Sequence, residues 1–218
     1  MILAVCGGKG GVGKTTTALN LAAELDAVLV DADLGMADVP AGRGPDLHDV
    51  LAGRADAVEA VREADGVSLL PCGRTLAGAR EGDPRRLVDA LRAVADAYGD
   101  VVVDCPAGLR ADVGLPLLVA DACVLVTTPD RAALADALRA RSLAVELDAG
   151  LAAVAYNRAP EASEAVANAL GAPVVAVPDA DSVAAAMTAG RPVAAVDGEA
   201  EAVERFGALA ERVRAARE

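Results

Sequence analysis

The chain alternates between short apolar runs and longer segments in which apolar residues recur at helical spacing. The short runs are typical of buried strands, and they cover residues 2–6, 27–30, 67–70, 101–103, 123–127, 151–156 and 173–177. The longer segments predict helices over residues 16–25, 46–52, 84–98, 131–147, 161–170 and 199–216. Because helices separate most of the strands, the pattern predicts an α/β fold with a mostly parallel sheet and helices on both faces.

Length and composition favour one domain. A chain of 218 residues with 54% hydrophobic residues can bury one substantial core. We therefore predict a single domain over residues 1–218. Aromatic residues are limited to Tyr98, Tyr156 and Phe206, so the core must consist of Ala, Val and Leu, and platforms for stacking nucleobases are not expected.

The net charge of −13 disfavours partners that carry negative charge. Phosphate backbones and anionic lipids would both be repelled unless arginines clustered locally, and the chain has no run of four or more basic residues. Generic nucleic-acid binding is therefore not expected. Two explanations of the acidic, lysine-poor composition remain open: solubility in concentrated salt, and a base-composition bias of the genome that exchanges Lys for Arg.

The spacing of the cysteines argues against metal and dithiol redox sites, and the lack of a targeting signal bears on where the protein works in the cell. Cys6, Cys72, Cys105 and Cys123 form no C-x-x-C pair, which is the usual spacing for zinc, iron–sulfur and dithiol redox sites. We expect buried thiols that behave as small hydrophobic groups. The first residues already form a predicted strand, and no apolar run is long enough to cross a bilayer. A cytoplasmic protein is therefore expected.

The segment between the first strand and the first helix carries the clearest chemical signal. It holds the only two lysines of the chain and reads Gly8-Lys9-Gly10-Gly11-Val12-Gly13-Lys14-Thr15-Thr16. Its glycines allow the backbone to curl with the N–H groups pointing inward, and the following helix adds its positive end. Lys14 can place its ammonium group near the outer phosphates of a nucleotide, while the Thr15 hydroxyl can ligate the accompanying Mg²⁺. The segment predicts a phosphate-binding loop, because a simple turn would need neither the Lys-Thr pair nor so many glycines.

Acidic residues follow two of the predicted strands, at the end of the sheet where ligands bind. Asp31 and Asp33 follow the strand at 27–30, and Asp104 follows the strand at 101–103. Near a phosphate-binding loop, such a carboxylate usually holds Mg²⁺ directly or through water. For Asp31, a solvated turn residue is the alternative. Pro106 and Gly108 make the next segment a stiff turn that can sense the γ-phosphate.

Taken together, these segments resemble the MinD/ParA family of deviant Walker A ATPases, and within it the archaeal-type MinD-like members. The resemblance rests on the KGGVGKTT loop, with Lys9 five residues before Lys14, on the DADLG and DCPAG segments, and on the late Asn157-Arg158 pair. Segments at 47–53, 70–73, 177–179 and 190–193 resemble the family in the same order, so the similarity covers essentially the whole chain. It implies a P-loop NTPase fold.

The resemblance also implies a function. It implies an ATPase that binds ATP with Mg²⁺, forms a homodimer when ATP is bound, and hydrolyses ATP slowly to reset a switch. Such a switch would serve spatial positioning, of the cell division site or of another cargo, with an unidentified protein cargo or activator as partner. A ParA-like DNA-segregation ATPase and a nucleotide-binding module without turnover are the alternatives.

The resemblance assigns roles to the charged residues of the predicted site. Lys9 would reach across the dimer to the partner's phosphates, while Lys14 would act on the nucleotide of its own subunit. Asp33 would orient the attacking water, and Asp31 and Asp104 would support Mg²⁺ and its waters. The alternative for Lys9 is a solvated loop residue.

At the base of the nucleotide, the resemblance implies that Asn157 reads the adenine edge, because an amide can donate and accept at once. Arg158, Pro178 and Asp179 would complete the nucleotide site. The alternative for Asn157 is a residue that caps the end of a strand.

The sequence departs from the family in two places. Asp38 and Pro40 stand where many MinD proteins have Asn followed by Asp, so the chemistry of the first switch is expected to differ. We expect no basic C-terminal amphipathic helix of the kind that binds membranes, and therefore no direct membrane binding. The final predicted helix should instead dock on the core through Val203, Phe206, Leu209, Ala210 and Val213. His48, the sole histidine, is expected to be an exposed helix residue without a role.

Overall fold

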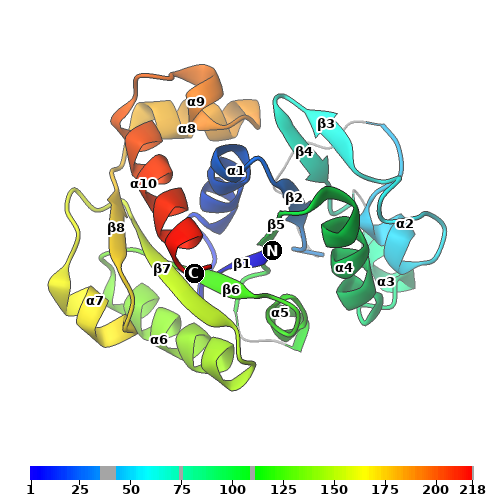
Figure 1. Ribbon diagram of the computed structural model, residues 1–218, viewed down its shortest axis with the longest axis horizontal. Coiled ribbons are helices and arrows are strands. Elements are labelled where there is room, and N and C mark those ends of the chain that lie inside the picture. The colour runs from blue at the N-terminus through cyan, green and yellow to red at the C-terminus, as the bar shows by residue number, and fades with distance from the viewer. Residues whose placement is uncertain (35–42, 74–75, 109–110, 218) are drawn as a thin grey trace.

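The computed structural model describes residues 1–34, 43–73, 76–108 and 111–217. The strands within these residues are β1 (Ile2–Cys6), β2 (Val28–Asp31), β3 (Arg62–Ala64), β4 (Val67–Leu70), β5 (Val101–Asp104), β6 (Ala122–Thr127), β7 (Gly150–Asn157) and β8 (Val174–Val177). They form one sheet in the order β3-β4-β2-β5-β1-β6-β7-β8 (Figure 1). Neighbouring strands run parallel, except that β3 is antiparallel to β4 at one edge.

Helices cover both faces of this sheet. On one face, an apolar cluster joins the sheet to α1 (Lys14–Leu25), α8 (Asp181–Ala189), α9 (Val193–Val196) and α10 (Glu201–Ala215). A second cluster joins the other face to α2 (Leu47–Leu51), α4 (Arg86–Tyr98), α5 (Ala111–Leu117), α6 (Arg131–Glu146) and α7 (Glu164–Leu170), and α3 (Leu76–Glu81) packs against α2. The predicted α/β class, with a mostly parallel sheet between two layers of helices, is confirmed.

Several short elements are absent from the sequence-based prediction, namely β3, α3, α5, α8 and α9. Strand β3 has only three residues, and the Asp65-Gly66 turn that joins it to β4 has positive φ angles of 49° and 88°. An Asp-Gly pair between two strands is a recognised hairpin signal. Helix α5 contains Pro116, a residue that argues against a helix interior.

The interior has the composition that the sequence predicts. Ala, Val and Leu dominate the buried residues, and Phe206 is the largest fully buried side chain. The four cysteines are all buried, as expected, and form no disulfide with one another. On α10, Leu209 and Val213 are buried together with Phe206, so the final helix docks on the core as predicted.

The expectation that His48 is an exposed helix residue is wrong. Its side chain lies in the interior, because the backbone N–H groups of Leu47 and His48 donate to the carbonyl oxygens of Pro71 and Cys72 at 2.8 and 3.0 Å. These bonds pin the start of α2 against the chain that follows β4. The imidazole is thereby placed inside, against the Cys72 thiol.

The two ends of the described chain lie close together near the centre of the view in Figure 1. The Met1 amino group and the Arg217 guanidinium both form ion pairs with Asp100, at 2.9 and 2.6 Å. Burial alone would raise the pKa of Asp100, but hydrogen bonds from Arg217 and the Met1 amine outweigh it and hold that pKa below its ordinary value. The end of α10 is therefore tied to β1 and β5 by charge as well as by apolar packing.

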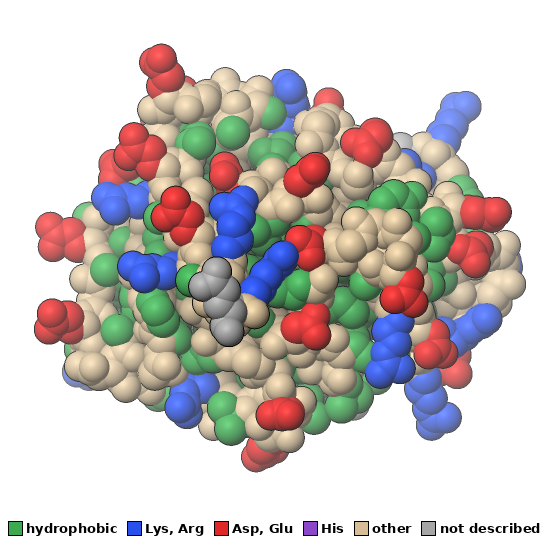
Figure 2. All heavy atoms as spheres, viewed as in Figure 1, with side chains coloured by type: hydrophobic (Ala, Val, Ile, Leu, Met, Phe, Trp, Pro, Cys, Tyr) green, Lys and Arg blue, Asp and Glu red, His purple; other side chains and the backbone are tan. Residues whose placement is uncertain are grey.

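Charge on the surface is mixed. On the face shown in Figure 2, basic side chains are interspersed with acidic ones and form no single continuous patch. In the part of the chain that the structure describes, no helix combines the length and the apolar character needed to cross a membrane.

Candidate nucleotide-binding site

The glycine-rich loop connects the central strand β1 to α1, at the carboxyl end of the sheet. Gly13, which precedes α1, has a φ of 96°, a conformation that favours glycine over any other residue. Gly8 packs so closely on α6 that a Cβ atom there would lie 2.4 Å from the Asp136 carbonyl oxygen. Glycine is therefore required at the loop for two separate reasons, one of backbone conformation and one of space.

Asn157, at the end of β7, holds this loop in place. Its amide nitrogen donates to the carbonyl oxygens of Val12 at 3.0 Å and Gly13 at 3.3 Å. The amide oxygen is buried, and it has no hydrogen-bond partner among the residues that the structure describes. The adenine contact expected of Asn157 stays a prediction, and it would have to use this oxygen, because the nitrogen already serves the loop. A buried acceptor without a partner fits the amino group of adenine.

A cavity of about 420 Å³ opens between the loop and α8. This volume lies within the usual range of small-molecule sites. Four residues expected at the base of the nucleotide line it, namely Asn157, Arg158, Pro178 and Asp179, together with residues 11–16 of the loop. The loop end of the cavity is polar. The far end is apolar, and it is formed by Val177, Ala180, Val183, Ala184 and Met187.

The apolar wall of the cavity is the part of the site that the sequence analysis missed. It comes from α8, where Val183 and Met187 stand one turn apart and Gly190 ends the helix in a left-handed conformation. The side-chain oxygen of Asn20 on α1 accepts from the Val193 N–H of α9 at 2.8 Å. This buried bond ties the helix that follows the loop to the segment that follows α8, so both walls of the cavity are held together.

Carboxylates and a hydroxyl meet beside the loop. Thr15 Oγ1 donates to Asp104 Oδ2 at 2.6 Å, and Asp31 pairs in register with Asp104 on the adjacent strand. Both carboxylates are buried, so a solvated turn residue, the alternative for Asp31, is wrong. The Asp33 N–H donates to Asp31 Oδ1 at 3.2 Å, which places Asp33 next to this cluster. Asp38 and Pro40 lie outside the described residues.

These oxygen donors suit Mg²⁺, which prefers carboxylates and hydroxyls and keeps several waters. Within the described ranges, no group of three or more His, Cys, Asp or Glu is placed to hold a metal ion. Thr15 and Asp104 fit an ion whose other ligands are phosphate and water. A hydrogen bond with Cys123 and burial raise the pKa of the Cys6 thiol, and burial raises that of Cys105. Both thiols stay protonated and do not compete as ligands.

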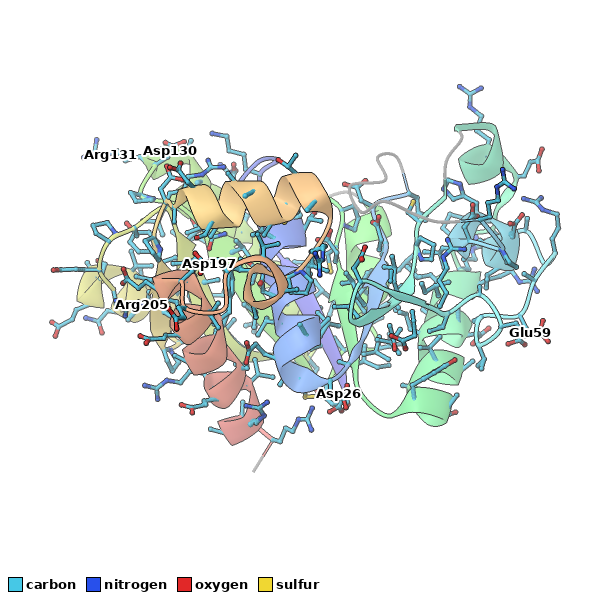
Figure 3. All side chains as sticks on the ribbon, turned by 90° about the horizontal axis from the view of Figure 1, so that it is seen from above. Asp26, Glu59, Asp130, Arg131, Asp197 and Arg205 are labelled. Carbon is cyan, nitrogen blue, oxygen red and sulfur yellow. The ribbon has the colours of Figure 1, made fainter. Side chains whose placement is uncertain are left out.

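The two lysines of the loop have opposite environments. Lys14 is 8% exposed and lines the cavity. Lys9 Nζ donates to Asp130 Oδ2 at 2.9 Å, and both side chains are about half exposed, at 47% and 51%. Asp130 also caps α6 by accepting from the Ala132 N–H, and it lies with Arg131 at the upper edge of the molecule in Figure 3. Hydrogen bonds from Lys9 and from that N–H lower the pKa of Asp130.

The fold and the site together define a P-loop nucleotide-binding protein. The glycine-rich loop lies at the carboxyl edge of a mostly parallel sheet, its Lys14 is buried, and its Thr15 is bonded to an aspartate at the end of a strand. The sequence pattern of the CobQ/CobB/MinD/ParA nucleotide binding domain matches residues 3–217, and the chain belongs to this family.

Individual relatives agree with this assignment. An uncharacterised ATP-binding protein of Methanocaldococcus jannaschii is 36% identical over 169 residues, which cover 72% of this chain and 64% of that protein. The structure is similar to the cell division ATPase MinD of Pyrococcus furiosus, with a TM-score of 0.90 and 27% identity over 98% of each chain. It is also similar to the septum site-determining protein MinD of Pyrococcus horikoshii, solved with Mg-ADP, with a TM-score of 0.89 and 27% identity over 97% of this chain and 94% of that one.

Proposed function

We propose that the chain is a MinD-like ATPase that binds ATP with Mg²⁺, dimerises when ATP is bound, and hydrolyses ATP slowly as a switch for spatial positioning. The observation that carries this proposal is the contrast between Lys14, buried in its own cavity, and Lys9, exposed on the surface of the same loop. A loop lysine that faces outward can reach the phosphates of a second subunit. The Mg-ADP complex of the P. horikoshii relative supports the choice of ligand.

Each residue of the site has a task in this proposal. Bound ATP would supply the phosphoanhydride bond, and Mg²⁺ would neutralise charge on its phosphates. Lys14 and the loop N–H groups bind phosphate, while Thr15 and Asp104 would hold the Mg²⁺ ion, with Asp31 beside Asp104 on the adjacent strand. Asp33 orients the attacking water, and the apolar wall of α8 receives the base.

The runner-up is a ParA-like ATPase that segregates DNA. The net charge of −13 and the interspersed charges of Figure 2 favour a protein partner over a nucleic acid. A nucleotide-binding module without turnover is the third candidate. Under the favoured proposal the protein works in the cytoplasm with an unidentified cargo or activator, and it does not bind membranes directly.

Isothermal calorimetry with ATP and Mg²⁺ tests the nucleotide site. Lys14→Ala should abolish measurable binding, because each charge-assisted contact to phosphate contributes roughly 1.5–3 kcal/mol. Unchanged affinity in this variant would refute the P-loop assignment. A phosphate-release assay on the wild type then separates an ATPase from a module without turnover, and co-sedimentation with DNA at low and moderate salt separates the MinD-like from the ParA-like candidate.

A further inference from the structure

Two buried side chains outside the cavity, His48 and Cys72, contact the backbone of the segment that carries Asp33. The Cys72 thiol donates to the Asp33 carbonyl oxygen at 3.0 Å. His48 Nε2 lies 3.3 Å from the Leu34 carbonyl oxygen and 3.6 Å from Cys72 Sγ. His48 is 4% exposed and Cys72 is 1% exposed, so these contacts are shielded from water.

The acceptors in these contacts determine which atoms of His48 and Cys72 carry a hydrogen. A carbonyl oxygen can only accept, so the His48 Nε2 atom must carry the hydrogen that it shares with Leu34. The Cys72 thiol has one proton, and the Asp33 carbonyl oxygen is its nearer acceptor. The imidazole and the thiol therefore hold consecutive carbonyl groups of one segment, each with its own hydrogen.

His48 and Cys72 come from two different segments of the chain, α2 and the segment that follows β4. Helix α2 begins with a capping box, in which Asp46 and Asp49 each accept from the other's backbone N–H. Its first residues are bonded to the backbone of Pro71 and Cys72, which brings His48 beside Cys72. Gly73 has a φ of 135°, and a Cβ atom there would lie 2.3 Å from His48 Nδ1. The imidazole fills the space that any other residue at 73 would need.

We propose that His48 and Cys72 are positioning residues that hold the backbone of Asp33 and Leu34, and through it the Asp33 carboxylate, in place for ATP hydrolysis. This inference rests on the proposed function, in which Asp33 orients the attacking water. On the N-terminal side of Asp33, its backbone N–H is held by the bond to Asp31. On the C-terminal side, the contacts from Cys72 and His48 hold the carbonyl groups of Asp33 and Leu34. This placement matters because a shift of about 1 Å at a reacting group can lower the rate roughly a hundredfold.

Steady-state hydrolysis and calorimetry on matched variants test the proposal. His48→Leu and Cys72→Ala each remove a donor, and each should lower kcat by about tenfold, the value of roughly one hydrogen bond in the transition state, while ATP affinity stays unchanged. His48→Gln and Cys72→Ser keep a donor and should recover most of kcat. Val50→Ala is the control: it removes buried volume from the same helix, so it should lower the melting temperature and leave kcat unchanged. Wild-type kcat in both donor-less variants, or an equal loss in Val50→Ala, would overturn the inference.

The Asp33→Ala background separates this inference from the proposed function. If Asp33→Ala is impaired, His48→Leu should add no further loss to it, because the imidazole acts through Asp33. Wild-type turnover in Asp33→Ala would overturn the proposed role of Asp33, and the inference with it. Impaired turnover in Asp33→Ala with normal turnover in His48→Leu and Cys72→Ala would overturn the inference alone.

The contact can also be tested without nucleotide. His48 is the only histidine, so a long-range proton–nitrogen correlation spectrum reports its ring without ambiguity. We expect a ring protonated on Nε2, with a resonance that shifts in Cys72→Ala and keeps its position in Val50→Ala. A ring protonated on Nδ1 alone would rule out the bond to Leu34.

Discussion

Removing the side-chain amide of Asn157 should weaken phosphate binding as well as base binding. In Asn157→Ala, the carbonyl oxygens of Val12 and Gly13 lose their bonds to the amide nitrogen, at 3.0 and 3.3 Å. Each such bond contributes about 0.5–1.5 kcal/mol, so the two together correspond to roughly 5- to 150-fold in affinity if the loop must be ordered to bind.

Two ligands distinguish the two roles of Asn157. Inorganic triphosphate with Mg²⁺ presents phosphates without a base, so its affinity reports the loop alone. If Asn157 acts only by holding the loop, ATP and triphosphate should weaken by the same factor in calorimetry. If the buried amide oxygen also accepts from adenine, ATP should weaken by a further factor of about 2–10, the value of one hydrogen bond.

Asn168→Ala is the matched control, because Asn168 is exposed on α7 and does not line the cavity. It should leave both affinities unchanged. Wild-type affinity of Asn157→Ala for triphosphate would refute the argument that Asn157 orders the loop. A loss confined to ATP would return Asn157 to the role of an adenine reader alone.

Three further predictions follow from the site and from the ends of the chain. Lys9→Ala should retain nucleotide but lose the ATP-dependent dimer in light scattering, whereas Asp130→Ala, which releases Lys9 and also removes the N-cap of α6, should keep it; a persistent dimer in Lys9→Ala would exclude the reach across the interface. Asp33→Ala should bind ATP and accumulate a dimer that does not turn over, since a water-orienting carboxylate acts mainly in the transition state; a phosphate-release rate near wild type would make Asp33 a structural turn residue. Arg217→Ala should lower the melting temperature slightly at neutral pH. The Asp100 pKa is lowered in the folded state, so the ion pair with Arg217 stabilises the fold above the ordinary Asp pKa of about 3.9. This stabilisation is lost as the pH falls through the folded pKa of Asp100. The difference in melting temperature between variant and wild type should therefore vanish in acid. A difference that persists there would point to packing.

The parts of the fold that the sequence predicts are those with a local signal. Strands such as β1 and β5 are buried on both faces, so they appear as continuous apolar runs. The loop at 8–16 is specified by residue types at fixed spacing. Short elements carry too few residues for a period, and so β3 and α9 were missed.

The site is less visible in the sequence where it depends on contacts between distant residues. Lys9 and Asp130 are 121 residues apart, and Asn157 lies 145 residues from Val12. No local pattern indicates that these groups meet. The burial of His48 has the same origin, because its surroundings come from the backbone of residues 71–73 and the carbonyl of Leu34. A polar residue in a short helix predicts exposure unless such contacts are known.

The contrast between the two lysines bears on how a switch of this kind can work. The loop itself is held by buried contacts, from Asn157 to its backbone and from Thr15 to Asp104, and these keep the cavity formed in a single subunit. Lys9 is held by an exposed ion pair with Asp130, which water and salt screen, so its release requires little free energy. A ligand shifts an equilibrium only by its difference in affinity between two states. Because the contact of Lys9 with Asp130 is weak, it contributes little to the difference in affinity between the monomer and the proposed dimer. That difference would have to come from the nucleotide that the partner's lysine would touch. This is the condition for a dimer that forms with ATP and separates after hydrolysis.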